Sequence, residues 1–229
     1  GGAGARRGGA GSVRGAGGGG AGPPAGGGGR RVLLLDVMDT LVRDPFFEDV
    51  PALFGLSLEE LFAQKHPTLW LDFESGAVSE EELLRGYFAD GREWDYQSLP
   101  RTLEEGYAWL PGAQEALGRM RAAPGLSLHA LSNYPVWYRN IEGKLRLSEH
   151  LEWSFVSCET GTRKPDAAAY EGAAAALGVP LDACVLVDDS ASNCAAAEAL
   201  GLGAVRFQGD WGAALAELEG LVGVPLTAP

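Results

Sequence analysis

Short apolar runs that end at a polar residue recur along the chain, and they are its most regular feature. They lie at residues 32–35, 126–131, 153–156, 184–187 and 204–207. Runs of this length without polar alternation are typical of parallel strands that are buried on both faces. The pattern therefore predicts five strands of a parallel sheet.

Stretches with helical spacing of apolar residues lie between these runs. We predict helices over residues 112–123, 134–145, 166–177, 193–200 and 212–221, two of which end at Gly178 and Gly201. Regular alternation of strands and helices indicates an α/β fold with a doubly wound parallel sheet.

The alternation is interrupted between the first strand and the helix that starts near residue 112. Residues 45–110 show helical spacing and hold 12 of the 20 aromatic residues of the chain. We interpret this segment as a helical cap inserted after strand one. The predicted catalytic core then comprises residues 31–44 and 111–222, followed by a tail at 223–229.

The first residues of the sequence have a different composition from the rest. Residues 1–29 contain 16 of the 34 glycines and no Asp or Glu. Such a stretch buries too little apolar surface to offset its ordering entropy, so we predict a disordered leader over residues 1–30. An acid-free, arginine-bearing leader fits the end of an organellar transit peptide; a low-complexity extension without a targeting role is the alternative.

Length and charge narrow the class of protein further. The 229 residues suffice for one domain with an insertion. After Arg31 the chain carries 13 basic against 31 acidic groups, a net charge of −18, and it has no basic run, which argues against nucleic-acid binding. No apolar stretch is long enough for a membrane span, and three cysteines without metal spacing suit buried thiols in a reducing compartment.

Polar residues at the ends of the predicted strands are the candidates for chemistry. Asp36, Ser132 and the pair Asp188 and Asp189 each follow an apolar run, and Lys164 stands in a loop after the third run. In open α/β sheets ligands bind at the carboxyl ends of the strands. A carboxylate nucleophile, a hydroxyl, a cation and acids for a hard metal ion together predict phosphoryl transfer. We find no GxSxG motif, phosphate-binding loop or metal-binding histidine spacing.

These four motifs in this order resemble the haloacid dehalogenase superfamily over residues 32–207, with a helical cap after the first motif. The resemblance implies that Asp36 is the nucleophile and forms an aspartyl-phosphate, and that Lys164 pairs with it and with the phosphate. Ser132, with its neighbour Asn133, and Thr40 would bind the phosphoryl group. Mg²⁺ would be held by Asp36, Asp188, Asp189 and the backbone carbonyl of Met38.

Several segments narrow the resemblance within the superfamily. DVMDTLVRDPFFEDVPALFG, KHPTLWLDFESG, SNYPVWY and EWSFVSCETGTRKPD look like the flavin mononucleotide (FMN) hydrolases of plant chloroplasts. This implies dephosphorylation of FMN to riboflavin in the chloroplast stroma. A flat heteroaromatic ring would stack on aromatic residues of the cap, for which we select Trp70 and Phe73. Because the body is acidic, Mg²⁺, Lys164 and Arg163 would have to supply the positive field for a phosphate.

The first motif departs from the superfamily pattern at Met38. Phosphatases of this superfamily have a second Asp two residues after the nucleophile, which acts as general acid and then as base, a role worth about 10²–10⁴ in rate. Asp39 and His66 are the candidates to replace it. The alternatives are a turn carboxylate for Asp39 and an ordinary helix-end residue for His66.

Two other functions stay open at this stage. The first is cleavage of a C–P or C–halogen bond, in which Lys65 could form a Schiff base. The second is a binding or regulatory protein that keeps the fold without turnover, for which Met38 is the argument. The substrate is in every case a small molecule, and the sequence leaves the oligomeric state undetermined.

Overall fold

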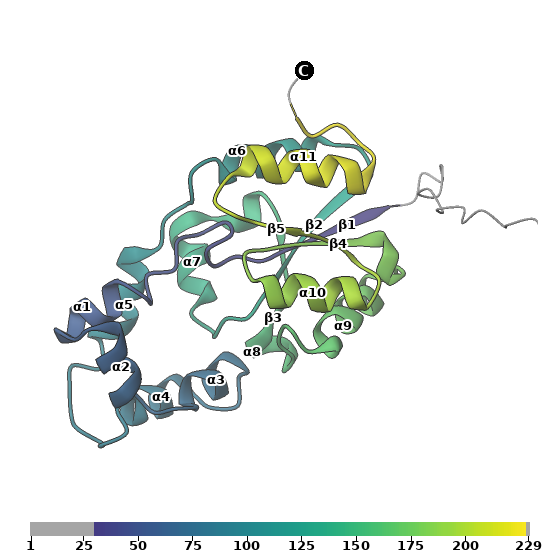
Figure 1. Ribbon diagram of the computed structural model, residues 1–229. Coiled ribbons are helices and arrows are strands. Elements are labelled where there is room, and N and C mark those ends of the chain that lie inside the picture. Colours follow the sequence, from purple (N-terminus) through teal and green to yellow (C-terminus); the bar gives the residue numbers. More distant parts are fainter. Residues whose placement is uncertain (1–29, 228–229) are drawn as a thin grey trace, which may run out of the picture.

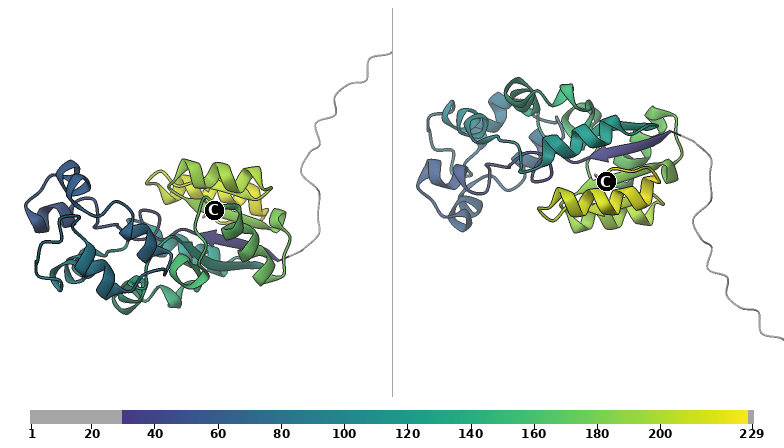
Figure 2. Two further views of the ribbon diagram at one scale, coloured as in Figure 1. Left: turned by 90° about the horizontal axis from the view of Figure 1, so that it is seen from below. Right: turned by 90° about the horizontal axis from the view of Figure 1, so that it is seen from above.

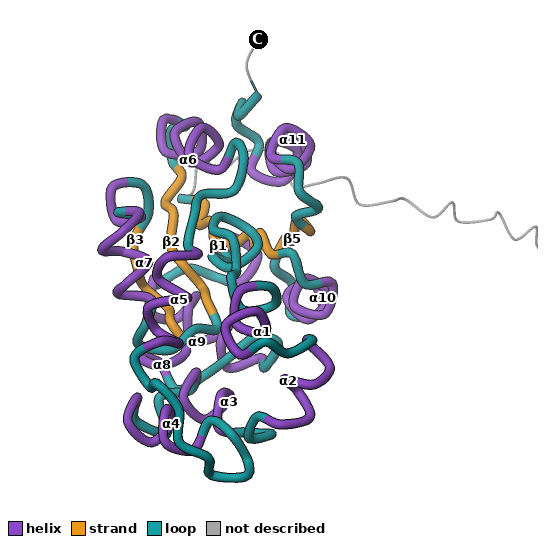
Figure 3. Tube along the Cα trace, turned by 90° about the vertical axis from the view of Figure 1, so that its left-hand side faces the viewer, coloured by secondary structure: helices purple, strands orange, loops and turns teal. Residues whose placement is uncertain are grey.

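A five-stranded parallel sheet forms the centre of the protein, which this computed structural model describes over residues 30–227. The strands are β1 (Arg31–Leu35), β2 (Leu126–Ser132), β3 (Glu152–Val156), β4 (Cys184–Asp188) and β5 (Gly203–Arg206). Their order is β3-β2-β1-β4-β5, which Figure 3 shows from the side where the strands end. The doubly wound parallel sheet and all five predicted strand positions are confirmed, within one or two residues at the ends. The predicted leader, except residue 30, lies outside the described residues.

Helices cover both faces of the sheet, as the unbroken apolar runs require. α6 (Ala113–Ala122) and α11 (Trp211–Val222) lie on one face, and α9 (Ala167–Leu177) and α10 (Ala191–Ala199) lie on the other (Figure 1). In β1, Leu33 and Leu35 pack into the core of the first face and Val32 and Leu34 into that of the second, all fully buried. Among residues 30–227, we find no helix with the length and apolar composition needed to cross a membrane.

The helix predicted from residue 134 begins later than the sequence suggests. α7 spans Tyr138–Leu145, and the preceding residues form a loop. The backbone N–H of Tyr134 donates to Ser157 Oγ (2.9 Å) in the short helix α8 (Ser157–Thr160), and Pro135 follows. This contact with a distant segment holds the loop against the sheet. Two short 3-10 helices complete this part, Leu147–Glu149 and Leu181–Ala183.

Five further helices lie between β1 and α6. They are α1 (Asp49–Phe54), α2 (Leu58–Gln64), α3 (Leu69–Glu74), α4 (Glu80–Gly86) and α5 (Ser98–Gly106). α2 and α4 begin with capping boxes, in which Ser57 pairs with Glu60 and Ser79 with Glu82. We call these five helices the helical insertion. Figure 2 shows it at one end of the molecule, beyond the carboxyl ends of the strands.

Aromatic side chains make up much of the interior of the helical insertion. The ring of Phe54 lies 4.9 Å from that of Phe88, 5.2 Å from that of Trp94 and 5.9 Å from that of Tyr87, measured between centroids. Most of the aromatic residues of this segment therefore serve packing. The division of the chain into a core of 31–44 and 111–222 and a cap of 45–110 stays a prediction.

The chain enters and leaves the helical insertion through two paired segments. Arg43 N–H donates to Ala108 O (2.8 Å) and Leu110 N–H donates to Leu41 O (2.9 Å), with an antiparallel bridge between Val42 and Trp109. We call residues 41–43 and 108–110 the neck. The Arg43 guanidinium also contacts Asp49 and Glu48 at the start of α1 and the Gly106 carbonyl at the end of α5.

Candidate active site

Three carboxylates converge at the carboxyl ends of β1 and β4, the two central neighbours in the sheet. Asp36 directly follows β1, and its backbone N–H continues the sheet by donating to Val187 O (2.9 Å). Asp188 is the last residue of β4, and Asp189 follows it. One oxygen from each of the three side chains lies within 4.8 Å of the other two. We call this group the carboxylate cluster; it unites three of the residues predicted to bind a metal ion.

The ammonium group of Lys164 lies inside the carboxylate cluster. Its Nζ donates to Asp36 Oδ1 (2.8 Å) and to Asp188 Oδ2 (2.5 Å), and the lysine is only 2% exposed. Burial alone would lower the pKa of Lys164, but the two carboxylates hold it above its usual value. Burial also raises the pKa of Asp36 to about 7, against the opposing effect of Lys164. The lysine thus favours the charged form of Asp36, which is the form that can attack an electrophile.

Two asparagines fix the charged groups in place. The side chain of Asn133 accepts from the backbone N–H of Lys164 (2.8 Å) and donates to its carbonyl (2.7 Å). Asn193 Nδ2 donates to both oxygens of Asp188 (3.0 and 3.1 Å), and Ser190 N–H donates to Oδ1 (2.9 Å). Asn133 therefore positions Lys164. This role is additional to the contact with the phosphoryl group that the family resemblance implies for Asn133. Asn193 stands at the start of α10, and no motif in the sequence signals its role.

The hydroxyl groups predicted at the phosphate lie beside the carboxylate cluster. Thr40 Oγ1 donates to Asp36 Oδ2 (3.3 Å). Ser132 is the last residue of β2 and is 2% exposed, and no described residue forms a hydrogen bond with its Oγ. A buried hydroxyl without a partner is costly, so the Ser132 hydroxyl has unused capacity for a ligand oxygen.

A cavity of about 400 Å³ opens next to the carboxylate cluster, between the sheet and the helical insertion. We call it the sheet-edge cavity. Its lining consists of Met38, Asp44, Phe46, Phe47, Phe62, Lys65, Pro67, Trp70, Leu71, Glu74, Asn133 and Tyr134. Phe47, Phe62 and Leu71 are three of the four large apolar side chains that the described residues leave exposed. This apolar exposure at one cavity indicates a binding surface for a flat, apolar ligand.

The two aromatic residues selected from the sequence have different surroundings. Trp70 lines the sheet-edge cavity, and its ring packs on that of Phe46 with centroids 5.2 Å apart. Phe73 is 2% exposed and packs against Trp137 (4.9 Å), away from the cavity lining. The structure therefore brings Trp70, but not Phe73, to the cavity.

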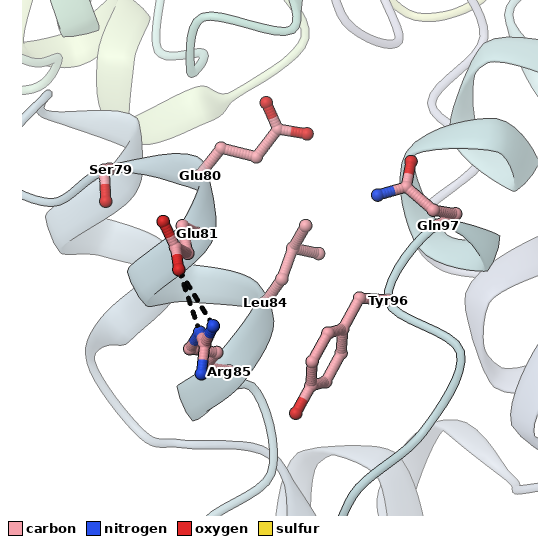
Figure 4. A pocket seen from close by; sticks show the side chains of 7 residues that line it. All are labelled: Ser79, Glu80, Glu81, Leu84, Arg85, Tyr96 and Gln97. Carbon is pink, nitrogen blue, oxygen red and sulfur yellow. Dashed lines mark hydrogen bonds and ion pairs between the residues drawn. The ribbon is translucent and has the colours of Figure 1, made fainter.

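A second cavity, of about 490 Å³, lies in the helical insertion and contains none of the predicted site residues. Figure 4 shows its lining, which includes Glu80, Glu81, Tyr96 and Arg85. The Arg85 guanidinium pairs with Glu81 Oε1 (3.0 Å), so the charges of these two residues offset each other. Glu80 then leaves the lining of this cavity with a net negative charge. A phosphate would be repelled here, so this cavity does not suit a phosphate ester.

The candidates for the second acid of the first motif lie outside the sheet-edge cavity. Asp39 Oδ1 accepts from the backbone N–H of Asp44 (2.9 Å), as a turn carboxylate does. His66 Nδ1 accepts from Leu69 N–H (3.1 Å) at the start of α3, as a helix-end residue does. Met38 itself lines the cavity and is 9% exposed.

Two cavity carboxylates, Asp44 and Glu74, have no counterpart in the sequence analysis. Glu74 Oε1 accepts two hydrogen bonds from the Arg163 guanidinium (2.8 and 3.1 Å), so Arg163 neutralises Glu74 and is not free for a phosphate. Asp44 Oδ1 accepts from Phe46 N–H (2.8 Å), and burial raises the pKa of Asp44 to about 6. Asp44 precedes Pro45, which indicates a turn, but nothing in the sequence predicts that Asp44 lines the cavity.

The chemistry of the donor set decides which metal ion the carboxylate cluster can hold. All of its ligand atoms are carboxylate oxygens, which suit hard divalent cations such as Mg²⁺ and not the softer transition metals. Asp189 is half-buried, and burial together with Asp188 raises its pKa. A dication between these oxygens would relieve that repulsion, so the residues fit the predicted metal ion.

Comparison with known proteins agrees with this geometry. The model of the haloacid dehalogenase-like hydrolase family matches residues 33–201. The chloroplastic flavin mononucleotide hydrolase 1 of Arabidopsis thaliana is 46% identical over 177 residues, which are 77% of this chain and 72% of that protein.

Solved structures support the fold. A haloacid dehalogenase family enzyme of Bacteroides thetaiotaomicron, solved as an aspartate-to-alanine variant with magnesium and inorganic phosphate, superposes with a TM-score of 0.68 at 17% identity. The match covers 80% of this chain and 97% of that one. A predicted hydrolase of the same kind from Porphyromonas gingivalis gives a TM-score of 0.67 at 24% identity, over 82% and 97% of the two chains.

Proposed function

The chain belongs to the haloacid dehalogenase-like hydrolases, and from this premise we propose that it is a Mg²⁺-dependent phosphatase that converts FMN to riboflavin and phosphate. The observation that carries the proposal is the Asp36–Lys164–Asp188 arrangement at the edge of an aromatic cavity. The arrangement provides a nucleophile and a cation, and the cavity provides a place for a flat ring.

Asp36 is the nucleophile in this proposal. Its carboxylate attacks the phosphorus of FMN, the bond from phosphorus to the ester oxygen breaks, and an aspartyl-phosphate forms while riboflavin leaves. Water then attacks the same phosphorus and releases inorganic phosphate, which restores Asp36. Lys164, at 2.8 Å from Asp36 Oδ1, offsets the charge that develops on the phosphoryl oxygens, and the Ser132 hydroxyl donates to one of them.

The carboxylate cluster of Asp36, Asp188 and Asp189 would hold Mg²⁺. When bound, the ion supplies positive charge to the phosphoryl oxygens. A protein that carries a net charge of −13 needs such a local source of positive charge to receive a phosphate dianion. The backbone carbonyl of Met38 is the fourth protein ligand that the family resemblance implies.

The sheet-edge cavity holds the isoalloxazine ring. Trp70, Phe46 and Phe62 provide aromatic faces, and offset stacking adds about 0.5–1.5 kcal/mol per pair beyond the burial of apolar surface. The exposed side chains Phe47 and Leu71 gain burial when the ring enters. The similarity to the chloroplast enzyme of Arabidopsis also supports a location in the chloroplast, where FMN and riboflavin would be its substrate and product.

A panel of phosphate esters tests the proposed function. Phosphate release is measured with FMN, flavin adenine dinucleotide, pyridoxal phosphate, sugar phosphates and nucleotides, each with Mg²⁺ and with excess chelator, and with Asp36→Asn as the blank. We expect FMN to be the fastest substrate and the chelator to abolish release. Faster turnover of a non-flavin ester would overturn the choice of FMN, and an equal rate in chelator would overturn the metal-dependent mechanism.

Lys65 favours one other candidate function, cleavage of a C–P bond through a Schiff base. Its side chain lines the sheet-edge cavity, and burial lowers the pKa of its amine, which increases the nucleophilic neutral form. The amine would condense with a substrate aldehyde, with loss of water, to form an imine. Borohydride trapping of a phosphonoaldehyde on wild type, with Lys65→Met as control, separates this activity from ester hydrolysis.

A further inference from the structure

The first motif lacks the acid that a phosphatase of this kind needs for its leaving group. Expulsion of an alkoxide from FMN requires a proton, and the thioether of Met38 has none to give. The group that supplies the proton must reach the ester oxygen, which lies between the carboxylate cluster and the flavin ring. The lining of the sheet-edge cavity offers carboxyl groups at this place, Asp44 and Glu74.

The loop after β1 brings a second carboxylate back to this place. Asp39 adopts a left-handed conformation (φ 53°), and its N–H donates to Val42 O (2.7 Å), which closes a tight turn. The Asp39 carboxylate then accepts from the backbone N–H of Asp44 (2.9 Å). The chain thus leaves the end of β1 and returns to it, so Asp44 and Met38 line the same cavity.

We propose that Asp44 is the general acid and base of the reaction and takes the role that Met38 cannot perform. The inference rests on the proposed function and assigns one further catalytic residue to it. In the first step, Asp44 gives its proton to the ester oxygen as the bond to phosphorus breaks, so riboflavin leaves as an alcohol. In the second step, the Asp44 carboxylate takes a proton from the water that attacks the aspartyl-phosphate, and the cycle closes with Asp44 protonated.

The hydrogen bonds of Asp44 leave one oxygen available. Oδ1 accepts from Phe46 N–H (2.8 Å), which fixes the rotation of the carboxyl group. No hydrogen bond from residues 30–227 engages Oδ2. The nearby guanidinium of Arg43 is occupied by Asp49 (2.7 and 2.9 Å) and Glu48 (2.8 Å), so it does not pair with Asp44.

Of the other candidate acids, one is engaged by a cation and two lie outside the lining of the sheet-edge cavity. Glu74 also lines the sheet-edge cavity, but its Oε1 accepts two hydrogen bonds from Arg163. Asp39 and His66 bond backbone N–H groups and are not among the described residues that line the cavity. Asp44 is therefore the carboxyl group of the cavity that is free to exchange a proton.

The surroundings of Asp44 suit a proton donor at neutral pH. Burial, with a contribution from the charge of Asp39, raises its pKa to about 6. A general acid or base works best when its pKa lies near the operating pH. The titratable and charged groups around it are Asp39 and Arg43 on its own loop, Asp189 after β4, Tyr107, Tyr134, and Lys65 and Glu74 across the cavity.

The test compares leaving groups in Asp44→Asn. Asparagine keeps an oxygen that accepts from Phe46 N–H, so the loop should be preserved, and Asp44→Ser gives a second variant with an acceptor. Each is assayed with the alkyl ester that wild type hydrolyses fastest and with p-nitrophenyl phosphate, whose leaving group needs no proton. Asp39→Asn is the matched control on the same loop.

We expect Asp44→Asn to lose about 10²–10⁴-fold in rate with the alkyl ester. With p-nitrophenyl phosphate we expect a burst of one p-nitrophenol per enzyme, changed less than tenfold in rate, followed by slow turnover as the aspartyl-phosphate accumulates. In wild type, kcat/KM should fall as pH rises because Asp44 loses its proton. This decrease should be absent from the pH profile of Asp44→Asn. Asp39→Asn should keep the wild-type ratio between the two substrates.

A p-nitrophenol burst slowed as much as hydrolysis of the alkyl ester, or a selective loss with the alkyl ester in Asp39→Asn instead, would overturn the assignment of Asp44. This failure is distinct from failure of the proposed function. If wild type hydrolyses another ester but not FMN, the substrate is wrong and the ratio measured with that ester still decides the role of Asp44.

Discussion

Replacing Lys164 by methionine tests whether its ammonium group stabilises the site by offsetting the repulsion between Asp36 and Asp188. Methionine has a similar length and fills the same buried space, but it removes the only cation that contacts both Asp36 (2.8 Å) and Asp188 (2.5 Å) among residues 30–227. Both carboxylates are buried, with 7% and 0% exposure, so water cannot replace the lost contacts.

The expected loss can be worked from the distances. Two carboxylate charges at most 4.8 Å apart, as in the carboxylate cluster, repel each other by at least about 3.5 kcal/mol at an effective dielectric constant of about 20. Removing one partner of a buried ion pair typically costs about 3–5 kcal/mol. We therefore expect Lys164→Met to lower the free energy of unfolding by about 3–5 kcal/mol near pH 8, which is above the pKa of Asp36 in wild type.

The loss should depend on pH in a defined direction. The pKa of Asp36 is raised by burial to about 7, above the value of 3.8 for an unperturbed group, so the folded state binds its proton more tightly than the unfolded state. Its stability contribution is therefore greatest at low pH and falls as pH rises through about 7. Without Lys164 the pKa of Asp36 rises further, so the decrease in stability continues to higher pH. The difference between wild type and variant should therefore be smaller at pH 5.5 than at pH 8.

Urea unfolding followed by tryptophan fluorescence measures these differences, at both pH values and with or without Mg²⁺. Lys144→Met is the control, because Lys144 is exposed and donates only to the backbone carbonyls of Glu104 and Glu105. Mg²⁺ should stabilise Lys164→Met more than wild type, since it restores positive charge to the same oxygens. Equal unfolding free energies for Lys164→Met and Lys144→Met at pH 8 would refute the electrostatic reasoning.

Four further substitutions examine single residues of the site. Asp36→Asn should abolish phosphate release and leave the melting temperature equal or higher, because one repelling charge leaves the cluster; activity within tenfold of wild type would contradict its role as nucleophile. Asp189→Ala should raise the Mg²⁺ concentration for half-maximal rate, whereas Asp188→Ala should also lower the melting temperature, because Asp188 accepts four hydrogen bonds. Met38→Asp should lower kcat, since a carboxylate would add charge to a crowded acidic site; a gain of about 10²-fold would mean that Asp44 does not replace the missing acid.

The sequence predicts the central sheet and the residues at its strand ends because one rule governs both. A strand buried on both faces must be apolar along its whole length, so the first polar residue after each run marks where the strand reaches the ligand side. Asp36, Ser132 and Asp188 follow from this rule. Lys164 does not end a strand, and only its order among the four motifs identifies it.

The sequence does not predict features that depend on contacts between distant segments. The late start of α7 depends on the bond from Tyr134 to Ser157, and the role of Arg163 depends on Glu74 in the helical insertion. Spacing within a helix does not show which face meets the sheet, which is why Trp70 and Phe73 could not be distinguished. Asp44 reaches the cavity through a left-handed residue that is not glycine, and such a turn has no reliable sequence signal.

The neck has a consequence for how this chain can change over evolutionary time. Because residues 41–43 pair with 108–110 and Arg43 ties α1 to the end of α5, the intervening helices form a loop whose two ends are already joined. The entropy cost of closing a loop grows only slowly with its length, by about 0.6 kcal/mol for each doubling. Insertions, deletions or exchange of whole helices can therefore reshape the walls around the flavin while the strand register and the reacting groups stay fixed. Asp44 is the exception, because it directly follows the first segment of the neck, residues 41–43. A change in the helices that follow would therefore also move the proposed proton donor.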